Sequence, residues 1–134
     1  MQTKTSKIAM IFDYFKQLKD TIEKYSHIVA NSTTNEKTYS NKRGFIAGKI
    51  HFTDETRLEF AEVKDIEKQE KIKYSYHYMD SRSTMQFRYD NTKHFPDIPS
   101  FPHHKHIQTG VIKSKEPEMD NVLAEIEKQV IKKR

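Results

Sequence analysis

The sequence predicts an α+β domain in which an antiparallel meander of four to five strands is flanked by an N-terminal and a C-terminal helix. Three observations lead to this prediction. Apolar residues recur with helical spacing near both ends of the chain, and alternating apolar and polar runs separated by turn signals fill the middle. The length of 134 residues suits one hydrophobic core. We therefore expect a single domain over residues 1–134.

The first element is a helix over about residues 6–24. Its apolar side chains are spaced by three or four positions, which places them along one face of a helix. Thr5 or Ser6 is suited to cap its first turn. The apolar stripe consists of Ile8, Ile11, Phe12, Phe15, Leu18 and Ile22.

The sheet is expected over about residues 26–91. It begins at Ile28 and Val29 with a segment that reads as a strand or a flexible loop, because the following residues are polar. The stretch "GFIAGKIHFTDETRLEFAEVKD" is a clearer hairpin with its turn at "TDET". The predicted register pairs Phe52 with Leu58 and Ile50 with Phe60, and exposes Lys49, His51 and Glu59 on the other face.

A second hairpin, "KIKYSYHYMDSRSTMQFRYDN", turns at "DSRS". One face should be buried and aromatic, and the other polar, because side chains alternate along a strand. The predicted buried pairs are Tyr78 with Met85, Tyr76 with Phe87, and Tyr74 with Tyr89. The predicted polar pairs are His77 with Gln86, Ser75 with Arg88, and Lys73 with Asp90.

An irregular loop rich in His and Pro follows over about residues 92–116, because residues 91–117 contain all four prolines and no periodicity. Helical spacing returns at Met119, Val122, Leu123, Ile126 and Val130. This predicts a C-terminal helix over about residues 117–132, with Pro117 at the first helical position.

Charge points to a partner that carries phosphate. The formal net charge is +5, and residues 71–115 contain eight Lys or Arg residues against three Asp and no Glu. Such a basic stretch suits nucleic acid, and RNA in particular for the chemistry below. The absence of cysteine excludes disulfides, thiolate nucleophiles and zinc–cysteine sites. No apolar run is long enough to cross a membrane, so we expect a cytoplasmic protein without a membrane partner.

The stretch "RYDNTKHFPDIPSFPHHKH" is the candidate catalytic segment. RNA cleavage without a cofactor needs an acid, a base and a cation near the phosphate, and histidine suits both proton roles near neutral pH. We expect His104 and His106 as the acid–base pair and Arg88 on the phosphate, with His94 and His77 assisting and Asp90 orienting a histidine. The expected substrate-binding residues are Lys73, Lys93, Lys105, Tyr89 and Asn91.

Two alternatives remain open. Histidines with a carboxylate can bind a divalent metal, and His104 and His106 could share one strand face. The metal alternative is a phosphodiesterase or nucleotide-modifying enzyme whose ligands would be His94, His103, His104 and His106, with Asp90 or Asp97. The second alternative is a binding module for nucleic acid or protein that catalyses nothing.

Residues 74–106, "YSYHYMDSRSTMQFRYDNTKHFPDIPSFPHHKH", resemble the kernel of the TumE family. The similar features are the tyrosine-rich strand, the strand that ends in "RYDN", and the closing "FPHHKH"; the turn "DSRS" differs in lacking glycine. The resemblance extends over about residues 44–130. It implies the toxin of a type II-like toxin–antitoxin module, with a cognate helix-turn-helix antitoxin as partner. Whether the protein forms a homodimer stays open.

Overall fold

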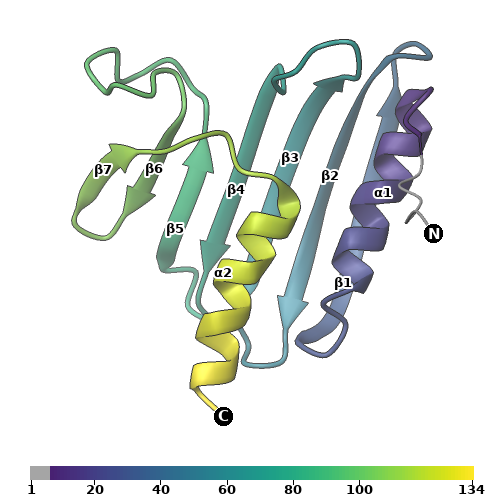
Figure 1. Ribbon diagram of the computed structural model, residues 1–134. Coiled ribbons are helices and arrows are strands. Elements are labelled where there is room, and N and C mark those ends of the chain that lie inside the picture. The colour runs from purple at the N-terminus through teal and green to yellow at the C-terminus, as the bar shows by residue number, and fades with distance from the viewer. Residues whose placement is uncertain (1–6) are drawn as a thin grey trace, which may run out of the picture.

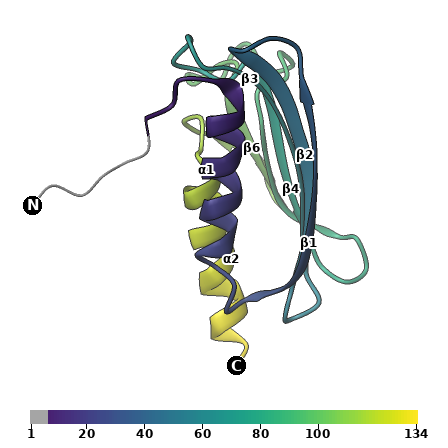
Figure 2. The same cartoon turned by 90° about the vertical axis from the view of Figure 1, so that its right-hand side faces the viewer.

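The computed structural model describes residues 7–134, and it shows one antiparallel sheet with two helices (Figure 1). The strands lie side by side in their order along the chain, so each one pairs with its neighbours in sequence. Both helices pack on the same face of the sheet, and residues 7–134 place no helix on the opposite face (Figure 2). The elements are α1 (Ile11–Glu23), β1 (Val29–Thr38), β2 (Arg43–Phe52), β3 (Arg57–Asp65), β4 (Lys73–Met79), β5 (Met85–Asp90), β6 (His104–Ile107), β7 (Gly110–Lys113) and α2 (Met119–Lys132).

The α+β class and the antiparallel meander are confirmed, but the prediction of four to five strands is wrong, because the described residues form seven. The segment read as strand or loop is β1, which pairs with β2 along its length. The segment expected to be an irregular loop contains the hairpin β6–β7. Each of these two strands has only four residues, which is too short for an alternating pattern to be recognised.

The predicted registers of both central hairpins are wrong by two residues. In the first hairpin Ile50 pairs with Leu58 rather than with Phe60. The turn there is tighter than expected: the Phe52 amide donates to the Thr56 carbonyl at 2.9 Å, and Glu55 adopts a positive φ of 73°. A shift of two residues preserves the side-chain alternation, so every residue stays on its predicted face.

The second hairpin is shifted by an irregularity between Tyr78 and Met79. Its turn closes with a bond from the Asp80 amide to the Thr84 carbonyl at 3.0 Å. Consequently the predicted pairs of this hairpin are replaced, and the observed pairs are Tyr78 with Phe87, Tyr76 with Tyr89, His77 with Arg88 and Ser75 with Asp90. In the observed register, His77 is therefore the cross-strand neighbour of Arg88.

Helix α1 begins later than predicted. Asp13 accepts bonds from the amides of Ala9 and Met10 at 3.2 and 2.9 Å and so satisfies free donors of the first turn. The predicted caps Thr5 and Ser6 lie outside the described residues. The stripe is mostly confirmed, since its buried members are Ile11, Phe15, Leu18 and Ile22. Phe12 is exposed, because it lies about 100° around the helix from Ile11.

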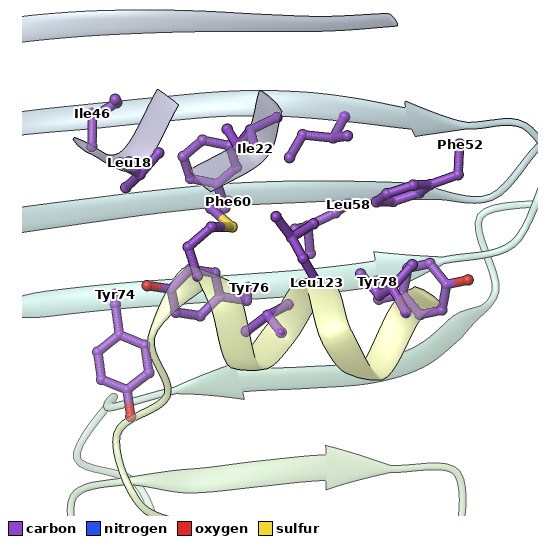
Figure 3. Close-up of a cluster of buried hydrophobic side chains, with 14 of the residues drawn as sticks. Leu18, Ile22, Ile46, Phe52, Leu58, Phe60, Tyr74, Tyr76, Tyr78 and Leu123 are labelled. Carbon is purple, nitrogen blue, oxygen red and sulfur yellow. The ribbon is translucent and has the colours of Figure 1, made fainter. Parts of the chain in front are cut away.

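Helix α2 buries all five residues of its predicted stripe. Pro117 is not its first residue, because the helix begins at Met119. In the core, the side chains of Tyr74, Tyr76 and Tyr78 extend from the same face of β4, and Leu123 of α2 lies near Tyr76 and Tyr78 (Figure 3). Burying these rings under the helices leaves the other face of β4 and β5 for polar side chains.

Candidate functional site on the open face

The open face of β4, β5 and β6 gathers the predicted catalytic residues from three strands. His77, Arg88 and His106 are successive cross-strand neighbours in one row. Asp90 and His104 pair in the adjacent row. Strand alternation therefore brings together side chains that lie up to about thirty residues apart in sequence. The prediction that His104 and His106 share a strand face agrees with their positions on β6.

Asp90 is the centre of this cluster, and its carboxylate is buried. Oδ1 lies 2.8 Å from His104 Nε2, while Oδ2 lies 3.0 Å from Arg88 Nε and 3.6 Å from His106 Nε2. Oδ1 also accepts the amide of Thr92 at 3.0 Å. The carboxylate thus faces three nitrogen-bearing side chains.

Two of these contacts are short but poorly directed. Among the described residues, neither Arg88 Nε nor His104 Nε2 has a hydrogen-bond partner, although both atoms are buried. Their distances to Asp90 fit ion pairs, but their N–H directions do not fit hydrogen bonds. Unpaired buried polar atoms are rare in folded proteins and call for an explanation.

The loop before β6 adds an aromatic side chain to the site. The ring of Phe95 packs edge-on against His104 and His106, with ring centroids 4.9 and 5.8 Å apart. His104 is only 1% exposed, whereas the side chains of Arg88 and His106 are 42% and 26% exposed. The sequence carried no signal for Phe95, because its position depends on the path of an irregular loop.

Electrostatics favour the neutral form of two histidines here. Burial and the nearby Arg88 lower the pKa of His77, and Glu59 opposes this shift only partly. Burial also lowers the pKa of His106, where Asp90 opposes the shift and the charge of Arg88 adds to it. Both rings therefore present an unprotonated nitrogen near neutral pH.

His104 and His106, the predicted acid–base pair, differ in how far they are buried. A general acid or base must reach its substrate. His106 borders the open surface, but His104 lies beneath Phe95 and beside Asp90. The geometry favours a supporting role for His104, behind the surface. His94 is exposed on the loop next to Phe95.

Three of the predicted substrate-binding residues lie elsewhere. Lys105 and Tyr89 are on the helix-covered face, where both bind Glu125 of α2, at 2.7 and 2.6 Å. Asn91 bonds the backbone of Tyr74 and Ile72 at 3.1 and 3.2 Å and fixes the start of β4. Lys73 and Lys93 are exposed.

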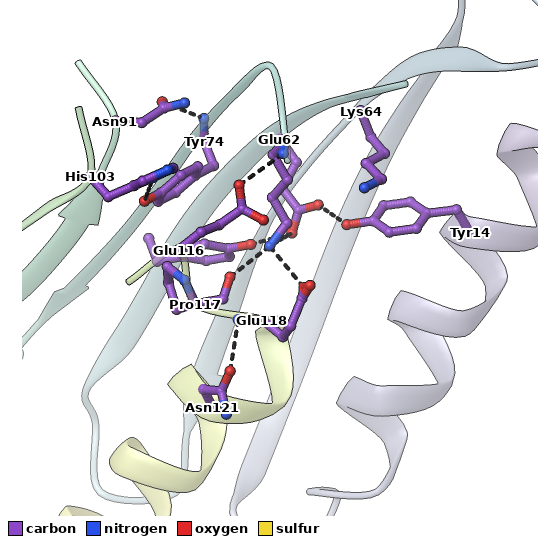
Figure 4. A network of polar contacts seen from close by, with 12 residues as sticks. Tyr14, Glu62, Lys64, Tyr74, Asn91, His103, Glu116, Pro117, Glu118 and Asn121 are labelled. Carbon is purple, nitrogen blue, oxygen red and sulfur yellow. Dashed lines mark hydrogen bonds and ion pairs between the residues drawn. The ribbon is translucent and has the colours of Figure 1, made fainter. Parts of the chain in front are cut away.

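The four histidines proposed as one metal site fall into different groups. His103 lies on the other side of the sheet, with Nδ1 2.8 Å from the Tyr74 hydroxyl and Nε2 2.6 Å from Glu70. Glu116 completes this second cluster (Figure 4). His104 and His106 instead group with Asp90: one ligand atom from each lies within 4.8 Å of the others. His94 and Asp97 belong to neither group.

A buried polar network under the helices was not predicted. Glu62 accepts hydrogen bonds from the hydroxyls of Tyr14 and Tyr76, and the ammonium of Lys71 lies 4.0 Å from it. Figure 4 shows Tyr14 reaching Glu62 from α1, while Pro117 approaches from the segment before α2. Burial and the Glu62 charge raise the pKa of Tyr14 well above its usual value.

Fold and site together define a small protein that presents a cluster of His, Arg and Asp on an open sheet face. A family model described as Toxin TumE matches residues 18–134. The chain therefore belongs to the TumE family of toxins, as its sequence resemblance predicted. No curated protein and no solved structure matches the chain. No helix in residues 7–134 is long and apolar enough to cross a membrane.

Proposed function

We propose that this toxin acts on RNA by binding the phosphodiester backbone at the open face of β4–β6 and cleaving it. The observation that carries the proposal is the place of Arg88 between His77 and His106 in one cross-strand row. Asp90 holds the Nε side of the guanidinium, and no described residue accepts a hydrogen bond from its terminal Nη atoms. Those atoms suit the oxygens of a phosphate.

Proton transfer follows from the neighbours of Arg88. A base removes the proton of the 2′-hydroxyl, the resulting oxygen attacks phosphorus, and the bond to the 5′-oxygen breaks as that oxygen takes a proton from a water molecule, whose hydroxide is neutralised by the protonated base. His77 has a neutral ring beside the phosphate-binding arginine and is our candidate for the base. Charge that grows on the phosphate during the reaction is stabilised by Arg88.

The proposed partner is a cognate antitoxin of the helix-turn-helix class, as the family resemblance implies. The exposed cations Lys73 and Lys93 near the site also suit an acidic segment of such a protein. An antitoxin that covers this face would block RNA access by occupying the same surface.

The test is cleavage of end-labelled cellular RNA by the purified toxin and by Arg88→Ala. We expect the variant to lose at least about 100-fold in rate, since removing one group that stabilises the transition state costs this much. Arg82→Ala, in the exposed β4–β5 turn, is the matched control and should cut normally. Arg88→Lys keeps the positive charge but loses the bidentate hydrogen bonding of the guanidinium, so it should cleave at an intermediate rate.

DNA of the same sequence should stay intact, because it lacks the attacking hydroxyl. Circular dichroism must first show that each variant is folded. Normal cleavage by folded Arg88→Ala would refute the proposal. Salt-dependent RNA binding without any product would replace it with the binding-module alternative.

A further inference from the structure

We propose that Asp90, His104 and His106 bind a divalent transition-metal ion, with Zn²⁺ as the best fit, on the open face of the sheet. This inference concerns metal binding and stands independently of the reaction proposed above. It differs from the metal alternative drawn from the sequence, which joined four histidines. That alternative also allowed Asp90 or Asp97 as a ligand, and the structure selects Asp90 and two of those histidines.

The spacing of the three side chains suits a common ion. In a tetrahedral site, ligand atoms about 2.1 Å from the metal are about 3.4 Å from one another. Asp90 Oδ1 lies 2.8 Å from His104 Nε2, Asp90 Oδ2 lies 3.6 Å from His106 Nε2, and one ligand atom from each of the three residues lies within 4.8 Å of the others. Because β5 and β6 are paired strands, the ligand positions are fixed by the sheet.

A hydrogen bond to the backbone orients the His104 ring and determines which of its two nitrogens carries the hydrogen. Its Nδ1 lies 2.9 Å from the Pro102 carbonyl oxygen, which can only accept, so Nδ1 carries the hydrogen. In the neutral ring Nε2 then presents its lone pair. A metal-binding histidine is typically oriented in this way, by donating its other ring N–H to a backbone carbonyl or a carboxylate.

Nε2 of His104 lies beside the Asp90 carboxylate with no donor between them, and its lone pair does not point straight at the carboxylate oxygen. His104 is almost fully buried, and its Nε2 has no hydrogen-bond partner among the described residues. Two electron-rich atoms 2.8 Å apart are unfavourable. A cation shared by both atoms would remove this conflict. The rival explanation is a protonated His104 paired with Asp90, but the direction of the N–H does not fit that bond.

The donor set indicates the kind of ion. Two imidazoles and one carboxylate suit Zn²⁺ and its first-row neighbours, whereas Mg²⁺ and Ca²⁺ prefer oxygen ligands alone. Three protein ligands leave a position open for water or substrate. Arg88 opposes a cation through its charge, and a bound phosphate would offset that repulsion. If the proposed RNA cleavage holds, the ion would join Arg88 in stabilising the phosphate.

The second cluster provides the matched control. Glu70, His103 and Glu116 also place potential ligand atoms close together. Both nitrogens of His103 already have partners, however, in the Tyr74 hydroxyl and the Glu70 carboxylate. His103→Ala therefore removes a histidine of similar sequence context without touching the proposed site.

The test is calorimetric titration with Zn²⁺ of toxin that carries no His tag and has been stripped by a chelator. We expect one ion per chain, at least tenfold weaker binding in His106→Ala and in Asp90→Asn, and unchanged binding in His103→Ala. Co²⁺ should give the visible absorption of a tetrahedral site, and His106→Ala should lose it. Circular dichroism checks folding, and Asp90→Asn gives the answer if His106→Ala does not fold.

The proposal is overturned if the wild-type toxin shows no saturable Zn²⁺ binding, or if His103→Ala weakens binding while His106→Ala does not. These readouts do not involve RNA. Stoichiometric binding by a toxin that leaves RNA intact would support the metal site and refute the cleavage reaction, so the two failures are distinguishable.

Discussion

Replacing Lys71 with methionine should destabilise the fold more than most single substitutions, because it leaves a buried carboxylate without its cation. The side chain of Lys71 is 1% exposed and that of Glu62 is fully buried, with 4.0 Å between their charged groups. Lys71 also donates to the Pro117 carbonyl at 2.7 Å and pairs with Glu118 at 3.2 Å. The network thus joins β3, the segment before β4 and the start of α2.

The expected loss follows from the cost of an unpaired buried charge. Removing one partner of a buried ion pair typically costs about 3–5 kcal/mol. Methionine fills a similar volume, so the loss of packing adds little. The hydroxyls of Tyr14 and Tyr76 still donate to Glu62 in the variant, which favours the lower half of that range.

The assay is equilibrium unfolding in urea, followed by circular dichroism at neutral pH. The double variant Lys71→Met with Glu62→Gln removes both charges and should recover about 1–2 kcal/mol of the loss. Lys16→Met is the matched control, because its ion pair with Asp20 is solvent-exposed and worth at most about 0.5 kcal/mol. A loss below about 1 kcal/mol in Lys71→Met, or no recovery in the double variant, would refute this account.

Two further stability predictions concern the β2–β3 turn and the packing of β1 against β2. Burial alone would raise the pKa of Asp54, but bonds from Thr56 and Lys133 outweigh it and hold the pKa below its usual value. Asp54 therefore stabilises the fold above the pKa of an unfolded aspartate, near 4, and this contribution disappears as the pH falls through the lower folded value. Asp54→Asn should cost about 1 kcal/mol in urea unfolding at pH 7 and less at pH 2; equal losses at both would contradict the linkage. Gly48→Ala should cost about 1–3 kcal/mol, since its Cβ would lie 2.4 Å from the Thr33 carbonyl oxygen; unchanged thermal unfolding would show that β1 moves freely.

The sequence was sufficient for the helices and for the faces of the central strands, because both depend on side-chain periodicity. It was insufficient for register. Glu55 and Ser83 adopt positive φ angles in the two hairpin turns, and neither is a glycine that would have marked such a turn. The resulting two-residue shifts left the faces intact but changed every cross-strand pair.

The candidate site was predicted in composition but not in geometry. Alternation along β4 and β5 is enough to predict that His77, Arg88 and Asp90 share one face of the sheet. The pairing of β6 beside β5 was not foreseeable from four residues, and it decides that Lys105 faces α2 while His104 faces Asp90. The burial of His104 depends in addition on a loop without periodicity.

The strand order has a consequence for how the toxin is made. Because every strand pairs with its neighbours in sequence, the sheet can assemble in steps as the chain leaves the ribosome. The open face is complete once β6 has been synthesised, but the tyrosines of β4 stay uncovered until α2 follows. We therefore expect chains that end before Met119 to aggregate, so that harmful activity and a stable core appear together only in the last stage of synthesis.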